Sequence, residues 1–214
     1  MDTSFWHNRW QTNQTGWHES AVNPLLIAHF PSLNMPPGGR VFVPLCGKSL
    51  DLGWLLSRGY AVAGAELSEL AVTQLFTELG MEARISEVGT FKLFRGEKID
   101  IFVGDIFDLS REILGPVDAV YDRAALVALP ESMRGRYAAH LKAITVLAPQ
   151  LVIGYEYDQT MVEGPPFSVT PDELHRHYSE GYTLTLLARV EVPGGLKGKC
   201  PATEHVWRLD KHRS

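Results

Sequence analysis

The residues most able to bind a ligand or take part in a reaction lie where short apolar runs of the sequence end. Four such segments are Leu45-Cys46-Gly47-Lys48, Glu66, Gly104-Asp105-Ile106 and Asp122-Arg123. In an open sheet of parallel strands, ligands bind outside the carboxyl ends of the strands. The four segments therefore predict one ligand site, assembled from residues that are far apart in the chain.

Glu66 is the strongest single candidate because it directly follows the apolar run 61–65. It stands about 20 residues after Gly47, the interval typical of an acid that binds the ribose hydroxyls of a nucleotide-like cofactor. The alternative is a solvated acid that begins the next helix. Strand position and spacing favour the ligand role.

The loop 45–48 differs from the loops that bind phosphate groups. It has one glycine, whereas the G-x-G-x-x-G motif needs three, and a P-loop would need a glycine where this chain has Phe42. This argues against a nicotinamide-dependent oxidoreductase. A nucleoside cofactor without phosphate groups needs neither motif.

The next strand end offers two interpretations for each of its residues. Asp105 could approach an adenine, or it could cap the following turn. Ile106 could form an apolar wall beside the base, or it could pack in the core. The sequence leaves both pairs of alternatives open.

Arg123 lies between Asp122 and an apolar run, a setting that requires an ion-pair partner or a cleft. Pairing with Asp122, Glu66 or Asp105 is the structural alternative. Its place after a strand favours a role in the site, as a catalytic residue that positions substrate or cofactor through several fixed hydrogen bonds.

Three tryptophans precede the first predicted strand. Trp6 and Trp10 fall four residues apart, on one face of a short helix, and Trp17 follows in a polar segment. They could dock a helix on the core, form an aromatic lid over cofactor and substrate, or do both. We therefore expect residues 1–35 to form an aromatic-rich cap over the active site.

Strands and helices alternate in the hydrophobic pattern. We expect strands at 40–44, 61–65, 99–104, 117–122 and 151–155, a strand or hairpin within 84–95, and a terminal antiparallel hairpin from 183–192 and 203–209. Helices are expected near 6–10, at 50–58, 69–79, 131–147 and 171–178. This order predicts an α/β fold with a mainly parallel sheet of seven strands, covered on both faces.

Composition limits the remaining possibilities. The 214 residues are 45% hydrophobic and 21% charged, typical of one globular domain spanning residues 1–214. A net charge of −5 disfavours nucleic acid as a partner. No secretory signal or membrane span is apparent, so we expect a cytoplasmic protein with two reduced cysteines. The histidines and cysteines lack metal-site spacing, and we expect no metal.

Several segments together resemble the thiopurine S-methyltransferase family, in its bacterial type. They are FWHNRW, RVFVPLCGKSLDLGWLLSRGYAVAGAELSELAV, GDIFDL, YDRAALVAL and GPPFSV, and the resemblance runs from about residue 5 to 209. It implies a Rossmann-like class I methyltransferase that uses S-adenosyl-L-methionine and releases S-adenosyl-L-homocysteine. The implied substrates are thiopurines or other aromatic and heterocyclic thiols, with selenium and tellurium compounds linked to bacterial members.

The resemblance also implies roles for individual residues. Trp10, Leu45, Glu66 and Arg123 match cofactor-binding positions, Trp6 and the Asp105-Ile106 segment also line or approach the cofactor, and Trp17 matches a substrate-facing aromatic position. We also expect Gly47, in the loop after the first strand, to bind the cofactor. A basic residue near the terminal hairpin is linked to substrate in animal members, which leaves Lys197 and Lys199 as candidates here. We expect a monomer that acts on a small molecule.

Two other functions remain open at this stage. A related sheet could serve a methyltransferase for halide, hydrogen sulfide or another small anion. A protein that binds S-adenosyl-L-methionine without turnover would have the same cofactor residues. Turnover with different methyl acceptors distinguishes these possibilities.

Overall fold

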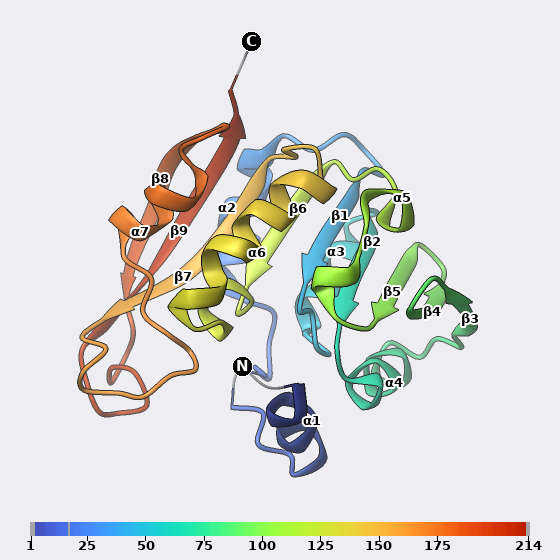
Figure 1. Ribbon diagram of the computed structural model, residues 1–214, viewed down its shortest axis with the longest axis horizontal. Coiled ribbons are helices and arrows are strands. Elements are labelled where there is room, and N and C mark those ends of the chain that lie inside the picture. Colours follow the sequence, from blue (N-terminus) through green and yellow to red (C-terminus); the bar gives the residue numbers. More distant parts are fainter. Residues whose placement is uncertain (1–2, 17, 213–214) are drawn as a thin grey trace.

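A nine-stranded sheet forms the centre of the computed structural model, which describes residues 3–16 and 18–212 (Figure 1). The strand order is β3-β4-β5-β2-β1-β6-β7-β9-β8. The strands are β1 Arg40–Pro44, β2 Ala61–Glu66, β3 Arg84–Val88, β4 Phe91–Gly96, β5 Ile99–Val103, β6 Ala119–Arg123, β7 Gln150–Tyr157, β8 Tyr182–Glu191 and β9 Ala202–Lys211.

The five central strands β5, β2, β1, β6 and β7 pair in parallel, as their alternation with helices predicts. β8 and β9 form the expected antiparallel hairpin, with β9 next to β7. The expected count of seven strands is wrong, because 84–95 forms two strands, β3 and β4, which extend the other edge of the sheet antiparallel to β5. Its loose alternation fits an edge hairpin that is exposed along much of β3.

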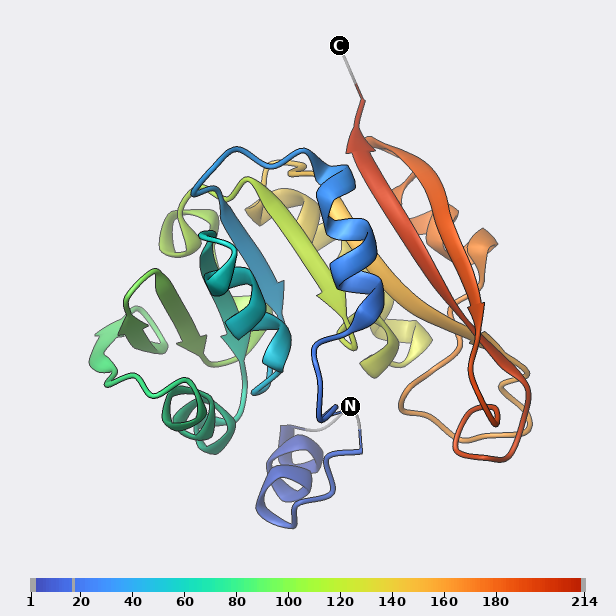
Figure 2. The same ribbon diagram turned by 180° about the vertical axis from the view of Figure 1, so that it is seen from behind.

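Helices cover both faces of the sheet. The helices are α1 Thr3–Gln11, α2 Pro24–His29, α3 Leu50–Ser57, α4 Glu69–Glu78, α5 Arg111–Leu114, α6 Glu131–Ile144 and α7 Pro171–Tyr178, with short 3-10 turns at 30–33, 106–108 and 126–128. Figure 1 shows α5, α6 and α7 in front of the sheet, and Figure 2, seen from behind, shows α2 and α3 over the opposite face.

The core is divided between these two faces by strand alternation. Phe42 of β1 belongs to the cluster that includes Tyr137 and Leu141 of α6, whereas Val41 and Val43 belong to the cluster on the α2 and α3 side. Every side chain named here is buried. Since both faces are covered, the central strands carry apolar residues on both faces of the sheet instead of on one face only.

Helix α6 ends at Ile144, three residues before the end that its apolar pattern predicts. Val146 and Leu147 have φ values of 55° and 59°. These left-handed backbone conformations cannot continue a right-handed helix. The apolar residues after 144 instead lie in the turn that leads into β7.

The part of the chain that the structure describes contains no helix long and apolar enough to cross a membrane.

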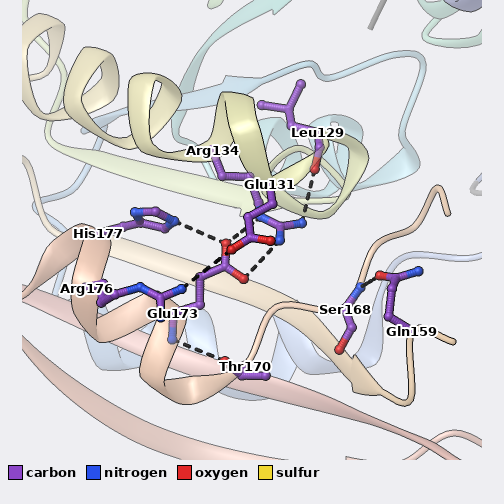
Figure 3. Close-up of polar contacts among 9 residues, drawn as sticks. All are labelled: Leu129, Glu131, Arg134, Gln159, Ser168, Thr170, Glu173, Arg176 and His177. Atoms are coloured by element: carbon purple, nitrogen blue, oxygen red, sulfur yellow. Dashed lines mark hydrogen bonds and ion pairs between the residues drawn. The ribbon is translucent and has the colours of Figure 1, made fainter.

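A buried ion pair joins α6 to α7 beside the loop that follows β6 (Figure 3). Arg134 Nε and Nη2 donate to the two carboxylate oxygens of Glu173 at 2.6 and 2.9 Å, and Arg134 Nη1 donates to the Leu129 carbonyl at 3.2 Å. His177 Nε2 lies 3.2 Å from Glu173 Oε1. The Arg134 and Glu173 side chains are 5% and 7% exposed, so the pair replaces most of its lost hydration with fixed contacts.

We predict that Glu173→Gln destabilises the fold strongly, because it leaves the Arg134 guanidinium buried without a countercharge. The free energy of unfolding should fall by about 3–5 kcal/mol in urea titrations. Glu131→Gln is the matched control, because Glu131 and Arg176 join the same two helices through a contact of 3.8 Å with both side chains exposed. Its cost should stay under about 1 kcal/mol. Equal losses in the two variants would contradict the assignment.

Candidate active site

The strand ends at 45–48, 66, 104–106 and 122–123 all contribute residues to one cavity of about 460 Å³. It lies at the carboxyl ends of the parallel strands, where Figure 1 shows α1 below the sheet. The predicted site residues among its lining are Trp6, Trp10, Leu45, Gly47, Glu66, Asp105, Ile106 and Arg123. Trp17, the predicted substrate residue, lies outside the described residues.

Backbone conformation shapes the loop after β1. Leu45 and Gly47 both have left-handed φ values, 47° and 52°, and the Cys46 N–H donates to the Ala65 carbonyl at 3.0 Å. A Cβ atom on Gly47 would come within 3.0 Å of the Trp10 ring. Glycine is therefore needed at position 47 for two reasons: it permits the turn, and it lets α1 pack directly on the loop.

Glu66 occupies the end of β2 with its side chain buried, so the interpretation as a solvated acid is wrong. Its Oε2 accepts the Gly47 N–H and its Oε1 accepts the Ser68 N–H, both at 2.8 Å. Burial raises the pKa of this carboxyl, and the backbone hydrogen bonds oppose the rise because they stabilise the carboxylate. The result is a fixed acceptor facing the cavity.

Asp105 and Ile106 each show the structural alternative together with a place in the cavity wall. Asp105 Oδ1 accepts the Phe107 N–H at 2.9 Å and so caps the 3-10 turn 106–108. Ile106 is buried in the core cluster that covers the α6 face. Both nevertheless line the cavity, which means that capping and packing position them there.

Arg123 points into the cavity at the end of β6, with its side chain 12% exposed. Its guanidinium nitrogens lie 3.7 Å from Asp51 Oδ2 and 3.6 Å from Glu19 Oε1. The partners expected from the sequence, Asp122, Glu66 and Asp105, do not form its recorded ion pairs. Both contacts are longer than a direct hydrogen bond, so the guanidinium is neutralised by charge while its N–H groups keep the capacity to bind a ligand.

Asp51 is the anchor of this group, and sequence reasoning missed it. Its Oδ2 accepts the Tyr121 hydroxyl and its Oδ1 accepts the Asn23 N–H, each at 2.8 Å. In the sequence it is an acid in the first turn of a helix, which has an ordinary explanation in the helix dipole. Only the fold brings it beside β6.

Asp122 fails to pair with Arg123 because successive strand residues face opposite sides of the sheet. Its buried carboxyl accepts the Tyr137 hydroxyl at 2.8 Å and the Leu126 N–H at 3.1 Å. Burial raises its pKa to about 6, with these hydrogen bonds opposing the shift. Asp122 thus holds the turn after β6 from the side away from the cavity.

Residues from both ends of the chain complete the cavity wall. Helix α1 contributes Trp6, Arg9 and Trp10. Of the two lysines near the terminal hairpin, Lys197 lines this cavity, whereas Lys199 lines a separate groove. Lys197 Nζ donates to the Pro165 carbonyl at 2.9 Å. Burial lowers the pKa of Lys197, and the nearby charge of Arg9 lowers it further.

Two polar residues on the terminal strands also escaped the sequence analysis. Tyr155 of β7 and Glu204 of β9 are direct neighbours across the sheet, and both line the cavity. Each stands in an alternating strand without a motif around it. Tyr155 lies near the end of β7 and Glu204 near the start of the antiparallel strand β9, which places both at the same edge of the sheet as Arg123.

The fold is similar to that of solved S-adenosyl-L-methionine-dependent methyltransferases. A structure of 1,6-didemethyltoxoflavin-N1-methyltransferase from Burkholderia thailandensis, with bound 1,6-didemethyltoxoflavin and S-adenosylhomocysteine, matches 98% of this chain and 87% of its own with a TM-score of 0.64. The sequence identity is 17%, so this likeness concerns the fold. It confirms the predicted fold class.

The sequence itself matches a narrower group. The family model for thiopurine S-methyltransferase matches residues 1–211. Thiopurine S-methyltransferase of Xanthobacter autotrophicus is 54% identical over 99% of this chain and 100% of its own length, and that of Teredinibacter turnerae is 53% identical over 99% of each. The resemblance predicted from the motifs is thereby confirmed: the chain belongs to the thiopurine S-methyltransferase family, whose enzymes use S-adenosyl-L-methionine.

Proposed function

We propose that this enzyme transfers a methyl group to the sulfur of small aromatic or heterocyclic thiols, thiopurines included. The observation that carries the proposal is the Arg123 guanidinium, which projects into a largely apolar cavity that also holds Glu66. Apolar side chains on the wall around it are Val127, Leu129, Met133, Ile153, Pro165 and Pro166. Apolar walls suit a flat ring, and a fixed cation suits a thiolate.

The residues present fit the cofactor. Each oxygen of Glu66 accepts one backbone N–H, and a carboxylate oxygen can accept further hydrogen bonds, here from ribose hydroxyls. Asp105 and Ile106 would offer a polar edge and an apolar face to the adenine. Leu45 and Gly47 would line the path between them, with Trp6 and Trp10 closing the cavity from α1. When bound, the cofactor supplies an electrophilic methyl group on a sulfonium sulfur.

The protein's contribution to methyl transfer is then position and charge. A thiolate is the reactive form of a thiol, and heteroaromatic thiols ionise readily, so Arg123 can favour the nucleophile electrostatically. Aligning sulfur with the methyl group inside the cavity removes much of the entropic barrier. A thiol that arrives ionised needs no dedicated base.

Lys197 extends the positive side of the cavity. It comes from the loop before β9, and Arg9 comes from α1, so the two cations approach from opposite ends of the chain. We assign to Lys197, and not to Lys199, the contact with substrate that the family resemblance raises. These two cations would attract anionic thiols.

The first prediction tests the substrate class directly. Purified enzyme with labelled S-adenosyl-L-methionine should methylate thiopurine and thiophenol in preference to hydrogen sulfide, selenite or iodide, because the small acceptors leave the apolar wall without contacts. The measurement is kcat/KM for each acceptor, side by side. Preference for a small anion would support the alternative methyltransferase, and cofactor binding without product would support a binding protein.

The second prediction concerns the proposed ribose acceptor. Glu66→Gln should weaken S-adenosyl-L-methionine binding roughly 10- to 100-fold in calorimetric titrations, as expected for lost hydrogen bonds to a charged group. Glu69→Gln, three residues later at the start of α4, removes an exposed carboxylate outside the cavity lining and serves as control. Unchanged affinity in the Glu66 variant, with normal folding, would exclude the assigned role.

The third prediction separates function from stability at Arg123. Arg123→Ala should lower kcat/KM for thiols by roughly 100-fold or more, as seen when a charge-stabilising donor is lost, while shifting thermal unfolding only modestly. Arg123→Lys should recover part of the rate, because it keeps the charge without the planar fork. If activity and melting temperature fell together in both variants, the residue would be structural.

A further inference from the structure

Tyr155 and Glu204 form a polar pair on the cavity wall that the steps above leave unused. They are direct partners in the antiparallel pairing of β7 with β9, so their side chains emerge on the same face of the sheet. Ile153, two residues before Tyr155 and therefore on that face too, is the parallel partner of Arg123. Register alone places the pair beside the guanidinium.

The Glu204 carboxyl is held at the cavity by these neighbours. The neighbouring Tyr155 hydroxyl and the positive charge of Arg123 both favour its ionised form and so lower its pKa. Burial raises the pKa of Glu204, as does the negative charge of Glu19 from the segment before α2. The cross-strand partner of Glu204 on β8 is Val190, which carries no charge.

A half-buried carboxylate with this set of contacts has unused capacity. An ionised carboxylate offers about four acceptor positions, more than the single neighbouring Tyr155 hydroxyl can fill. Arg123 is already shared between Asp51 and Glu19. A ligand that brings an N–H group into the cavity would supply a further hydrogen-bond donor to the Glu204 carboxylate.

Heterocyclic thiols bring such a group. Their neutral form carries its proton on the ring nitrogen beside a thiocarbonyl, so methylation at sulfur must also release that proton. Simple aryl thiols carry their proton on sulfur instead and are largely ionised near neutral pH, so they bring no ring proton that the site has to accept. A site that methylates heterocyclic thiols in their neutral form therefore needs a proton acceptor next to the reacting sulfur.

Building on the proposed function, we propose that Glu204 is the general base for heterocyclic thione substrates, and that Tyr155 is the residue that positions it. The thione sulfur forms a bond to the methyl carbon as the bond from that carbon to the sulfonium sulfur breaks, and the electron pair of the broken bond stays on the cofactor's sulfur. The ring N–H proton passes to Glu204, and its electron pair forms the ring C=N bond. The products are a neutral thioether, S-adenosyl-L-homocysteine and a protonated Glu204.

The surroundings suit this step. A carboxyl whose pKa is raised by burial is a stronger base than one in water. Arg123 and Glu204 then have separate roles. The Arg123 cation stabilises negative charge on sulfur, and the Glu204 carboxylate accepts the proton from nitrogen. The site can thereby use either ionised thiols or neutral thiones.

The test compares Glu204→Gln on two acceptors, pyridine-2-thione, which has the ring N–H, and thiophenol, which lacks it. With pyridine-2-thione we expect kcat to fall roughly 100-fold or more, the range for loss of a general base. With thiophenol it should stay within about threefold of wild type, since no ring proton is transferred. Glu156→Gln is the control, because Glu156 is adjacent to Tyr155 on β7 but lines the separate groove.

The pH profile gives a second readout that a purely structural role would not move. For pyridine-2-thione, wild-type kcat/KM should rise with pH as Glu204 ionises, and Glu204→Gln should lose this rise. Tyr155→Phe should shift it to higher pH, because the hydroxyl stabilises the carboxylate in the wild type. The thiophenol profile should lack this dependence on both residues.

Equal effects of Glu204→Gln on the two acceptors, including no effect on either, would overturn the inference while leaving thiol methylation intact. A collapse of folding or cofactor binding in that variant, with the same collapse in Tyr155→Phe, would show a structural pair and also overturn it. If the wild type methylated neither thiol, the proposed function itself would fail, and the inference with it.

Discussion

The Glu66 carboxylate links three of the segments that shape the cavity. It accepts the Gly47 N–H from the loop after β1 and the Ser68 N–H at the start of α4, and it stands itself at the end of β2. Burying a carboxylate is costly unless such hydrogen bonds compensate for lost water. The loop 45–48 is thus fixed by a charge that must also remain available to ligand, and α1 packs on that same loop through Trp10.

Opposite charges are arranged around Arg123 so that no single close partner neutralises it strongly. Arg123 lies at ion-pair distances from two carboxylates, and its contact with Asp51 is fixed from behind by Tyr121. Such an arrangement keeps the guanidinium in place without using all of its donors. Glu204 is placed in a similar way, because its cross-strand partner Tyr155 lies on the same face of the sheet and both residues line the cavity. Preorganised sites gain specificity in this way: neighbouring side chains hold the functional group rigidly, and its remaining hydrogen-bonding positions face the ligand.

Local sequence patterns were sufficient to locate the strand ends, because apolar runs of defined length precede Gly47, Glu66 and Arg123. They were insufficient for partners that meet across the fold. Asp51 contacts Arg123 although 72 positions separate them, and nothing around Asp51 distinguishes it from any acid at a helix start. The pairing of Tyr155 with Glu204 depends on strand register, which sequence alternation leaves undetermined to within steps of two residues. The extra hairpin 84–96 escaped the count for a related reason, since its exposed edge strand lacks a continuous apolar face.

The order of strands at the carboxyl-terminal edge has a consequence for the growing chain. β8 precedes β9 in the sequence, yet β9 lies between β8 and the rest of the sheet. When β8 leaves the ribosome, the strand that will hold it has not been made. Glu204 and the loop carrying Lys197 also belong to this last part of the chain. The parallel centre of the sheet is therefore synthesised before the strands that complete the cavity wall, and β8 can join the sheet only once β9 has been made.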